Sequence, residues 1–217
     1  MASDWSFIPS LISAASGLGG VWLGGWITSN RERSRERERI ERDASYLAVL
    51  VSAHLDRFAN GCLHVAFDDG TSEGRPAGRD GEYHQATAKA PVFDPLALGV
   101  DWKALPRDLM AEILGLPYKA ENLANHVAAV SEFDDPPDYN EFFWARQYGY
   151  AVLGLEVSEL ARKLREHTGI PYEPYKVGEW NRDDALREQR DKIAAEREAY
   201  QRRVTDRWTA SDDAGSL

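Results

Sequence analysis

The chain has 217 residues, a formal net charge of −10 at pH 7 and a single cysteine, Cys62. A nucleic-acid-binding surface is basic over at least one face, so this acidic balance argues against nucleic acid as a partner. One cysteine excludes an internal disulfide and a multi-cysteine zinc site within one chain.

Residues 7–29 form a stretch of 23 residues without one charged side chain. As a helix rising about 1.5 Å per residue, the stretch would be roughly 35 Å long, enough to cross a hydrocarbon core of about 30 Å. A cleaved secretory signal starts with basic residues, whereas this chain starts with Met1, Ala2, Ser3 and Asp4. We therefore expect residues 1–29 to be a retained transmembrane anchor.

Six arginines follow in the next thirteen residues, up to Arg42. Basic residues close to a membrane end are strongly biased toward the cytoplasmic side. The pattern predicts a single-pass protein of the cell inner membrane with its N-terminus outside and its C-terminal domain in the cytoplasm. The arginines nearest the span are expected to contact anionic lipid headgroups; they are Arg31, Arg33, Arg35, Arg37 and Arg39.

Small residues recur every four positions within the uncharged stretch, at Ser16, Gly20, Gly24 and Thr28. Residues four apart share one face of a helix, and a stripe of small residues lets two membrane helices approach closely. The stripe predicts a homo-oligomer that associates through this face. The glycine and serine content also makes the span only marginally hydrophobic, which favours a protein partner in the bilayer.

The cytoplasmic part is expected to be all-α. Residues 30–68 predict a charged neck followed by a long amphipathic helix, which continues the membrane helix as one rod to about Phe67. Its inward face would hold Ile40, Ala44, Leu47, Val51, Leu55, Phe58, Cys62 and Val65. Residues 69–100 lack a sustained period and predict a long loop.

Residues 101–178 are expected to complete a bundle of about four to five helices. One short helix follows Pro106 and is closed by Gly115 and Pro117, and a second runs from about Tyr118 to Glu132. Asp138 and Glu141 have the spacing of a capping box for the next helix, which Gly169 closes. That helix has the strongest apolar face and is expected to form the centre of the core, with Phe143, Tyr150, Leu153, Val157, Leu160 and Leu164.

Residues 179–208 predict a polar C-terminal helix with apolar residues seven apart at Leu186, Ile193 and Tyr200. One apolar position per heptad is a thin seam for a coiled coil. The helix could therefore lie on the bundle or pair with another subunit. Residues 209–217 are expected to be a disordered tail.

The sequence predicts no catalytic residue, no cofactor site and no metal site. The five histidines have no ligand spacing, and Cys62 lies on an apolar face, where a structural thiol is the usual role. The densest acidic group is Glu132, Asp134, Asp135, Asp138 and Glu141, which turns and caps explain without a metal. Phe142, Phe143, Trp144, Tyr148 and Tyr150 surround more than one helix face, which leaves a ligand or partner groove as an alternative to core packing.

The leading functional hypothesis is a membrane-anchored assembly or adaptor protein that associates with itself through the small-residue stripe. A second hypothesis, from another class, is a membrane-perturbing or pore-forming effector gated by its cytoplasmic domain. The third is a metal-dependent hydrolase that uses the acidic group around Asp134 and Asp135.

Overall fold

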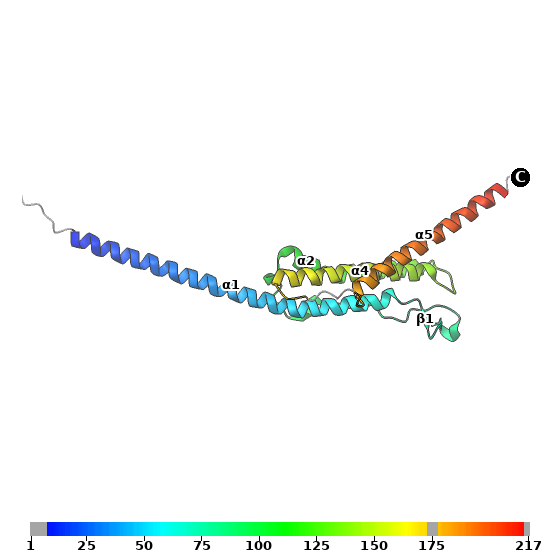
Figure 1. Cartoon of the computed structure of the whole chain (residues 1–217), viewed down its shortest axis with the longest axis horizontal. Coiled ribbons are helices and arrows are strands. Elements are labelled where there is room, and N and C mark those ends of the chain that lie inside the picture. Colours follow the sequence, from blue (N-terminus) through cyan, green and yellow to red (C-terminus); the bar gives the residue numbers. More distant parts are fainter. Residues whose placement is uncertain (1–7, 173–177, 215–217) are drawn as a thin grey trace, which may run out of the picture.

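The structure is a computed structural model, which describes the backbone of residues 8–172 and 178–214 and the side chains of residues 32–172 and 178–207. Its first element, α1 (Ile8–Ala66), is one unbroken helix of 59 residues. Figure 1 shows this helix as a rod whose N-terminal half projects from the bundle. Residues 8–29 of the uncharged stretch, the neck and the amphipathic helix therefore belong to a single element, as the sequence predicts.

Within the described part of the chain, none of the helices combines the length and apolar character needed to cross a membrane. The side chains of the predicted association stripe, Ser16, Gly20, Gly24 and Thr28, lie outside the described residues, as does that of Arg31.

The neck of α1, residues 32–43, is exposed on every face. Arg33, Arg35, Arg37 and Arg39 are therefore open to solvent, and Arg39 lies 3.9 Å from Asp43. The expectation that Ile40 belongs to the core is wrong, because its side chain is 48% exposed. The buried face of α1 begins one turn later at Ala44, near His167 and Thr168, where the partner helix α4 ends.

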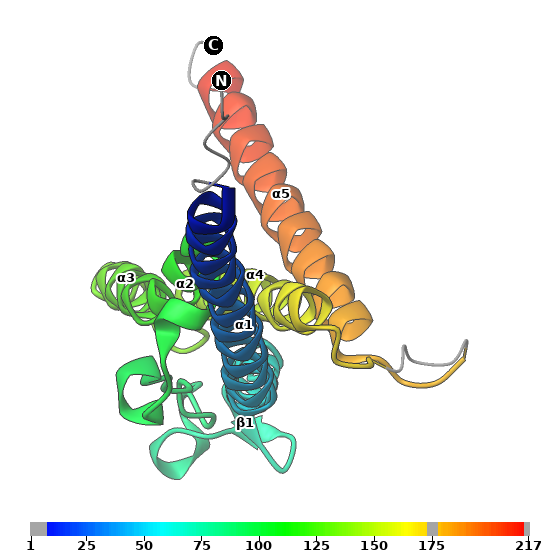
Figure 2. The same cartoon turned by 90° about the vertical axis from the view of Figure 1, so that its left-hand side faces the viewer.

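Four further helices complete the fold: α2 (Arg107–Leu114), α3 (Leu116–Ser131), α4 (Asn140–Thr168) and α5 (Arg182–Ala214). The central helix is α4, which packs against α1, α3 and α5. Figure 2, viewed along α1, shows α3 and α5 on opposite sides of the α1–α4 pair. The all-α bundle predicted from the sequence is confirmed.

The connection between α1 and α2 contains two short strands, β1 (Thr71–Ser72) and β2 (Arg75–Pro76), paired antiparallel with Thr71 opposite Pro76. Three single-turn helices follow, η1 (Arg79–Gly81), η2 (Pro95–Leu98) and η3 (Trp102–Ala104). Residues 67–106 therefore contain no long helix or strand, which agrees with the loop expected for residues 69–100. Phe93 and Leu105 anchor this connection in the core.

Two helix boundaries differ from the expected ones. Gly115 closes α2 as expected, but Pro117 belongs to the next helix: α3 begins at Leu116, two residues before the expected start near Tyr118, with Pro117 in its first turn. Proline is tolerated there because the first turn of a helix has no internal partner for its N–H groups. At the other end, α5 continues to Ala214, past the expected end at residue 208.

The start of α4 is capped by a different residue from the one expected. The side chain of Asp138 makes no cap bond, whereas Asp134 Oδ2 accepts a hydrogen bond from the backbone N–H of Phe142 at 2.8 Å. Tyr139, just before the helix, is left-handed with φ of 50°, so the chain turns sharply and brings Asp134 over the first turn. The predicted end at Gly169 is confirmed, and its φ of 67° suits a residue without a Cβ.

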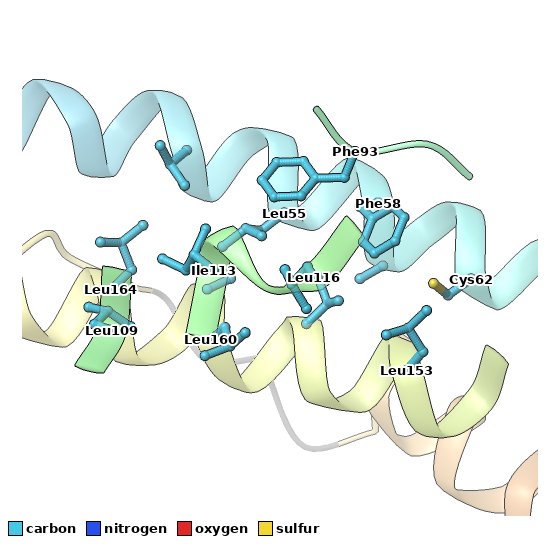
Figure 3. Packing of buried hydrophobic residues seen from close by; sticks show 14 of the residues in the cluster. Leu55, Phe58, Cys62, Phe93, Leu109, Ile113, Leu116, Leu153, Leu160 and Leu164 are labelled. Atoms are coloured by element: carbon cyan, nitrogen blue, oxygen red, sulfur yellow. The ribbon is translucent and has the colours of Figure 1, made fainter. Parts of the chain in front are cut away.

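The core lies between α1 and α4. Figure 3 shows Leu55, Phe58 and Cys62 of α1 facing Leu153, Leu160 and Leu164 of α4, with Ile113 and Leu116 closing the layer. All six apolar residues predicted for the α4 face are buried. On α3, Leu116 and Val127 are the buried residues.

The first half of α5 lies on the bundle, which is one of the two arrangements left open for this helix. Leu186 and Ile193 are buried, while Tyr200 is 42% exposed and packs edge-on against Trp144. A Cβ placed at Gly154 of α4 would lie 3.0 Å from Leu186 Cδ1 and 3.0 Å from Cys62 Cβ, so this glycine permits the close crossing. The remainder of α5 projects past the bundle (Figure 1).

We predict that Leu160→Ala lowers the free energy of unfolding by about 2–5 kcal/mol, because Leu160 is 1% exposed and the mutation leaves a cavity. Leu96→Ala is the control, since Leu96 is 77% exposed, and it should change stability by about 0.5 kcal/mol or less. Urea unfolding followed by circular dichroism measures both. Equal effects of the two substitutions would contradict the described core.

Candidate functional site

The candidate site is a pocket of about 480 Å³ at the end of the bundle farthest from Ile8, where α1 ends and α4 begins. We call it the distal pocket. Four segments line it: the connection that follows α1, the end of the connection between α3 and α4, the first two turns of α4 and the middle of α5. Its residues are Phe67, Asp69, His84, Asp138, Asn140, Phe143, Trp144, Gln147, Gln189, Lys192, Ile193 and Glu196.

A buried ion pair holds the connection against α4 beside this pocket. Arg146 Nη1 lies 2.7 Å from Asp68 Oδ2, and the two side chains are 7% and 2% exposed. Arg146 Nη2 also donates to the carbonyl oxygen of Ala88 at 2.5 Å. One guanidinium therefore fixes both ends of the segment between Asp68 and Ala88.

Asp68 is more fully hydrogen-bonded than its partner. Its carboxylate accepts the backbone N–H groups of Gly70, Thr87 and Ala88 and the hydroxyl of Thr87. Burial acts to raise the pKa of Asp68, but these bonds and that from Arg146 outweigh it and hold the pKa below the ordinary 3.8. Asp68 is therefore ionised at neutral pH and organises the turn that follows α1.

Two buried glutamines close the C-terminal end of α1. Gln189 Nε2 of α5 donates to the carbonyl oxygen of Ala66 at 3.0 Å, and Gln147 Nε2 of α4 donates to that of Asp68 at 2.9 Å. The last carbonyl groups of a helix lack partners within the helix, so Gln189 satisfies one of them at Ala66, while Gln147 satisfies a buried carbonyl in the turn that follows α1. Both glutamines also line the distal pocket.

His84 contributes an imidazole with a defined tautomer. Its Nδ1 lies 2.9 Å from the carbonyl oxygen of Asp69, and a carbonyl can only accept, so Nδ1 carries the proton. In the neutral ring Nε2 then keeps a lone pair. The ring stands edge-on to Phe143, with centroids 6.1 Å apart.

These groups suit recognition by hydrogen bonding and stacking. The pocket combines aromatic rings with amide, imidazole, ammonium and carboxylate groups, and its volume lies in the range of about 300–1,000 Å³ that is typical of ligand sites. The lining contains no serine, threonine or cysteine, so these residues supply no hydroxyl or thiol nucleophile. The arrangement therefore fits binding of a small polar or aromatic group.

Of the acidic group singled out in the sequence, Asp138 alone lines the distal pocket. Asp134 caps α4, and Glu141 lies 3.5 Å from Arg197 on α5. Among the residues that the structure describes, no three His, Cys, Asp or Glu side chains are grouped so as to hold a metal ion.

The aromatic set is divided between core and pocket. Tyr150 is 3% exposed in the core, while Trp144 lines the pocket and Phe143 lies between the two. Cys62 is completely buried, and burial raises the pKa of its thiol to about 12, which leaves it protonated and unreactive at neutral pH.

Sequence reasoning missed Asp68, Arg146, Gln147 and Gln189. Asp68 and Arg146 are 78 residues apart, so no local spacing reveals their pairing. The polar residues Arg146 and Gln147 could have pointed to this network, because they lie within the apolar face of α4 and buried polar residues on a core helix need hydrogen-bond partners.

Comparison of the chain with protein-family models, with curated proteins and with solved structures found no match.

We predict that Asp68→Asn lowers the free energy of unfolding at pH 7 by about 3–5 kcal/mol, because it leaves the buried Arg146 guanidinium without its counter-charge. Because the pKa of Asp68 is lower in the folded state than the ordinary value of 3.8, its carboxylate stabilises the fold at pH values above 3.8. This stabilisation is lost as the pH falls through the pKa of Asp68 in the folded state. The difference between wild type and variant should therefore shrink below about pH 4.

Urea titrations at a series of pH values test this expectation. Asp108→Asn, at an exposed position of α2, is the matched control and should follow the wild-type profile. A difference between wild type and Asp68→Asn that stays constant down to pH 2 would show that the carboxylate charge does not stabilise the fold.

Proposed function

We propose that this chain is a single-pass membrane protein that associates with itself and acts as an assembly or adaptor module on the cytoplasmic side of the cell inner membrane. The observation that carries the proposal is the continuity of α1. One helix of 59 residues joins the uncharged stretch to the apolar face that builds the core. Whatever fixes the first part of this helix in space therefore also fixes the bundle.

The membrane part of the proposal rests on the sequence of residues 7–29, which have no charged side chain. The exposed arginines Arg33, Arg35, Arg37 and Arg39 support it, since a neck that is solvated on every face leaves them accessible to anionic headgroups. Together with Arg31 they favour a cytoplasmic position for everything after the span.

Self-association is supported by the direction of exposed apolar groups on α1. Tyr46 follows Thr28 by 18 residues, which is about five full turns, so the two lie on the same side of the helix. Tyr46 is 67% exposed and Val49, on the neighbouring part of that side, is 59% exposed. By helix periodicity, the exposed Tyr46 and Val49 thus fall on the side of α1 to which the sequence pattern assigns the small-residue stripe.

The adaptor role is supported by the place of the distal pocket. It lies next to Phe67, about 37 residues or roughly 55 Å beyond Asn30 along α1. The helix would hold this pocket well away from the lipid surface, where it is accessible to a soluble ligand or a protein partner.

We predict that Gly20→Leu with Gly24→Leu weakens the oligomer at least about tenfold, because leucine side chains keep the helix backbones apart. Cross-linking in native membranes over a range of expression levels measures the change. Gly19→Leu with Gly25→Leu is the control, because Gly19 lies about 100° to one side of Gly20 and Gly25 about 100° to the other side of Gly24. It adds the same bulk away from the stripe and should leave the oligomer intact. A wild-type chain that stays monomeric throughout would defeat the proposed self-association.

A further inference from the structure

A second cavity, separate from the distal pocket, is lined by an unusual number of arginines for so acidic a chain. It measures about 280 Å³ and lies between the middle of α1, the second half of α4 and the first turns of α5. Five guanidinium groups line it, against three carboxylates, from Asp56, Glu159 and Asp183. The arginines of this arginine pocket are Arg162, Arg165, Arg182, Arg187 and Arg190.

Arg182 forms the fixed wall of the arginine pocket. Its side chain is 9% exposed, and it donates to Asp56 Oδ1 at 3.3 Å, to Asn60 Oδ1 at 3.1 Å and to Ser158 Oγ at 2.9 Å. These bonds join α5 to both α1 and α4. The cavity is therefore bounded by packed helices whose relative positions are set by its own wall.

Arg165 is the second nearly buried guanidinium, with 14% of its side chain exposed. Its Nη2 pairs with Asp56, and its guanidinium lies 5.4 Å from the centre of the Tyr172 ring. A cation held between a carboxylate and an aromatic face is preorganised, because its long side chain has little freedom left to lose when a ligand binds.

The remaining three arginines are held by weaker, replaceable partners. Arg187 pairs with Asp184, Arg190 with Asp191, and Arg162 with Glu159 and Glu166, each within its own helix. Exposed ion pairs of this kind contribute little to stability, so turning a guanidinium toward a bound anion costs little. Bidentate hydrogen bonds from guanidinium to phosphate are stronger than these surface pairs.

We propose that the arginine pocket binds a small molecule carrying a phosphate monoester. The planar guanidinium fork matches the oxygen geometry of a phosphate, and the arginines with exposed partners can exchange a carboxylate for it. The volume suits a small phosphorylated compound, whose organic part would contact Leu155 and Tyr172. Free phosphorylated metabolites and lipid headgroups share this chemistry, and the recessed site selects the free compound.

Binding of glycerol 3-phosphate to the full chain in neutral detergent, measured by isothermal titration calorimetry at constant ionic strength, tests the proposal. Saturable binding is expected, with no binding of glycerol. Arg187→Gln with Arg190→Gln should weaken it at least about tenfold, because the charged hydrogen bonds of both guanidinium groups to the phosphate are lost. Both side chains are partly exposed, so the substitution leaves the core intact.

Arg202→Gln with Arg203→Gln removes two charges from the exposed part of α5 and should leave the affinity unchanged. Dihexanoyl phosphatidate below its micelle concentration represents the lipid source and should compete weakly or not at all. The proposal is overturned if glycerol 3-phosphate shows no saturable binding, if both double variants lose affinity equally, or if the lipid analogue binds and glycerol 3-phosphate does not.

Discussion

The apolar contact between α1 and α4 is the constraint on which the other elements depend. Large aliphatic side chains from both helices meet there, and Leu55, Val157 and Leu164 are fully buried. Burial of a side chain of this size stabilises a fold by about 1.5–3 kcal/mol, whereas a short isolated helix is marginal in water. The short α2 and α3 and the polar α5 therefore hold their places because the α1–α4 pair offers them a surface.

Polar contacts then determine where the helices begin and end and how the connection runs, which apolar packing alone leaves undefined. The Asp68–Arg146 pair and the two glutamines determine where α1 stops and how the connection returns along α4. Arg182 does the same at the start of α5, through Asp56, Asn60 and Ser158. Each of the two pockets lies beside one of these polar networks, so the groups that specify the fold also shape the cavities.

The sequence allowed the helices to be predicted well and the cavities hardly at all. Heptad-like spacing identified the buried faces of α1 and α4, because that signal is local and repeats along each helix. Ile40 continues the same spacing and is nevertheless exposed, since its burial depends on where α4 ends. The cap by Asp134 depends on the turn at Tyr139, and the arginine pocket on a crossing of α4 and α5 that Gly154 permits. No periodicity in one segment encodes such contacts.

In the proposed function, α1 joins the bundle in the cytoplasm to residues 7–29, which would lie in the bilayer. Single cysteines in a Cys62→Ala background, reacted with a membrane-impermeant maleimide in sealed vesicles of known orientation, test this arrangement most directly. The account predicts that Leu18→Cys stays unmodified from both sides and that Ser34→Cys reacts from the cytoplasmic side alone. Modification of Leu18→Cys in intact vesicles at the same rate as Ser34→Cys would contradict it.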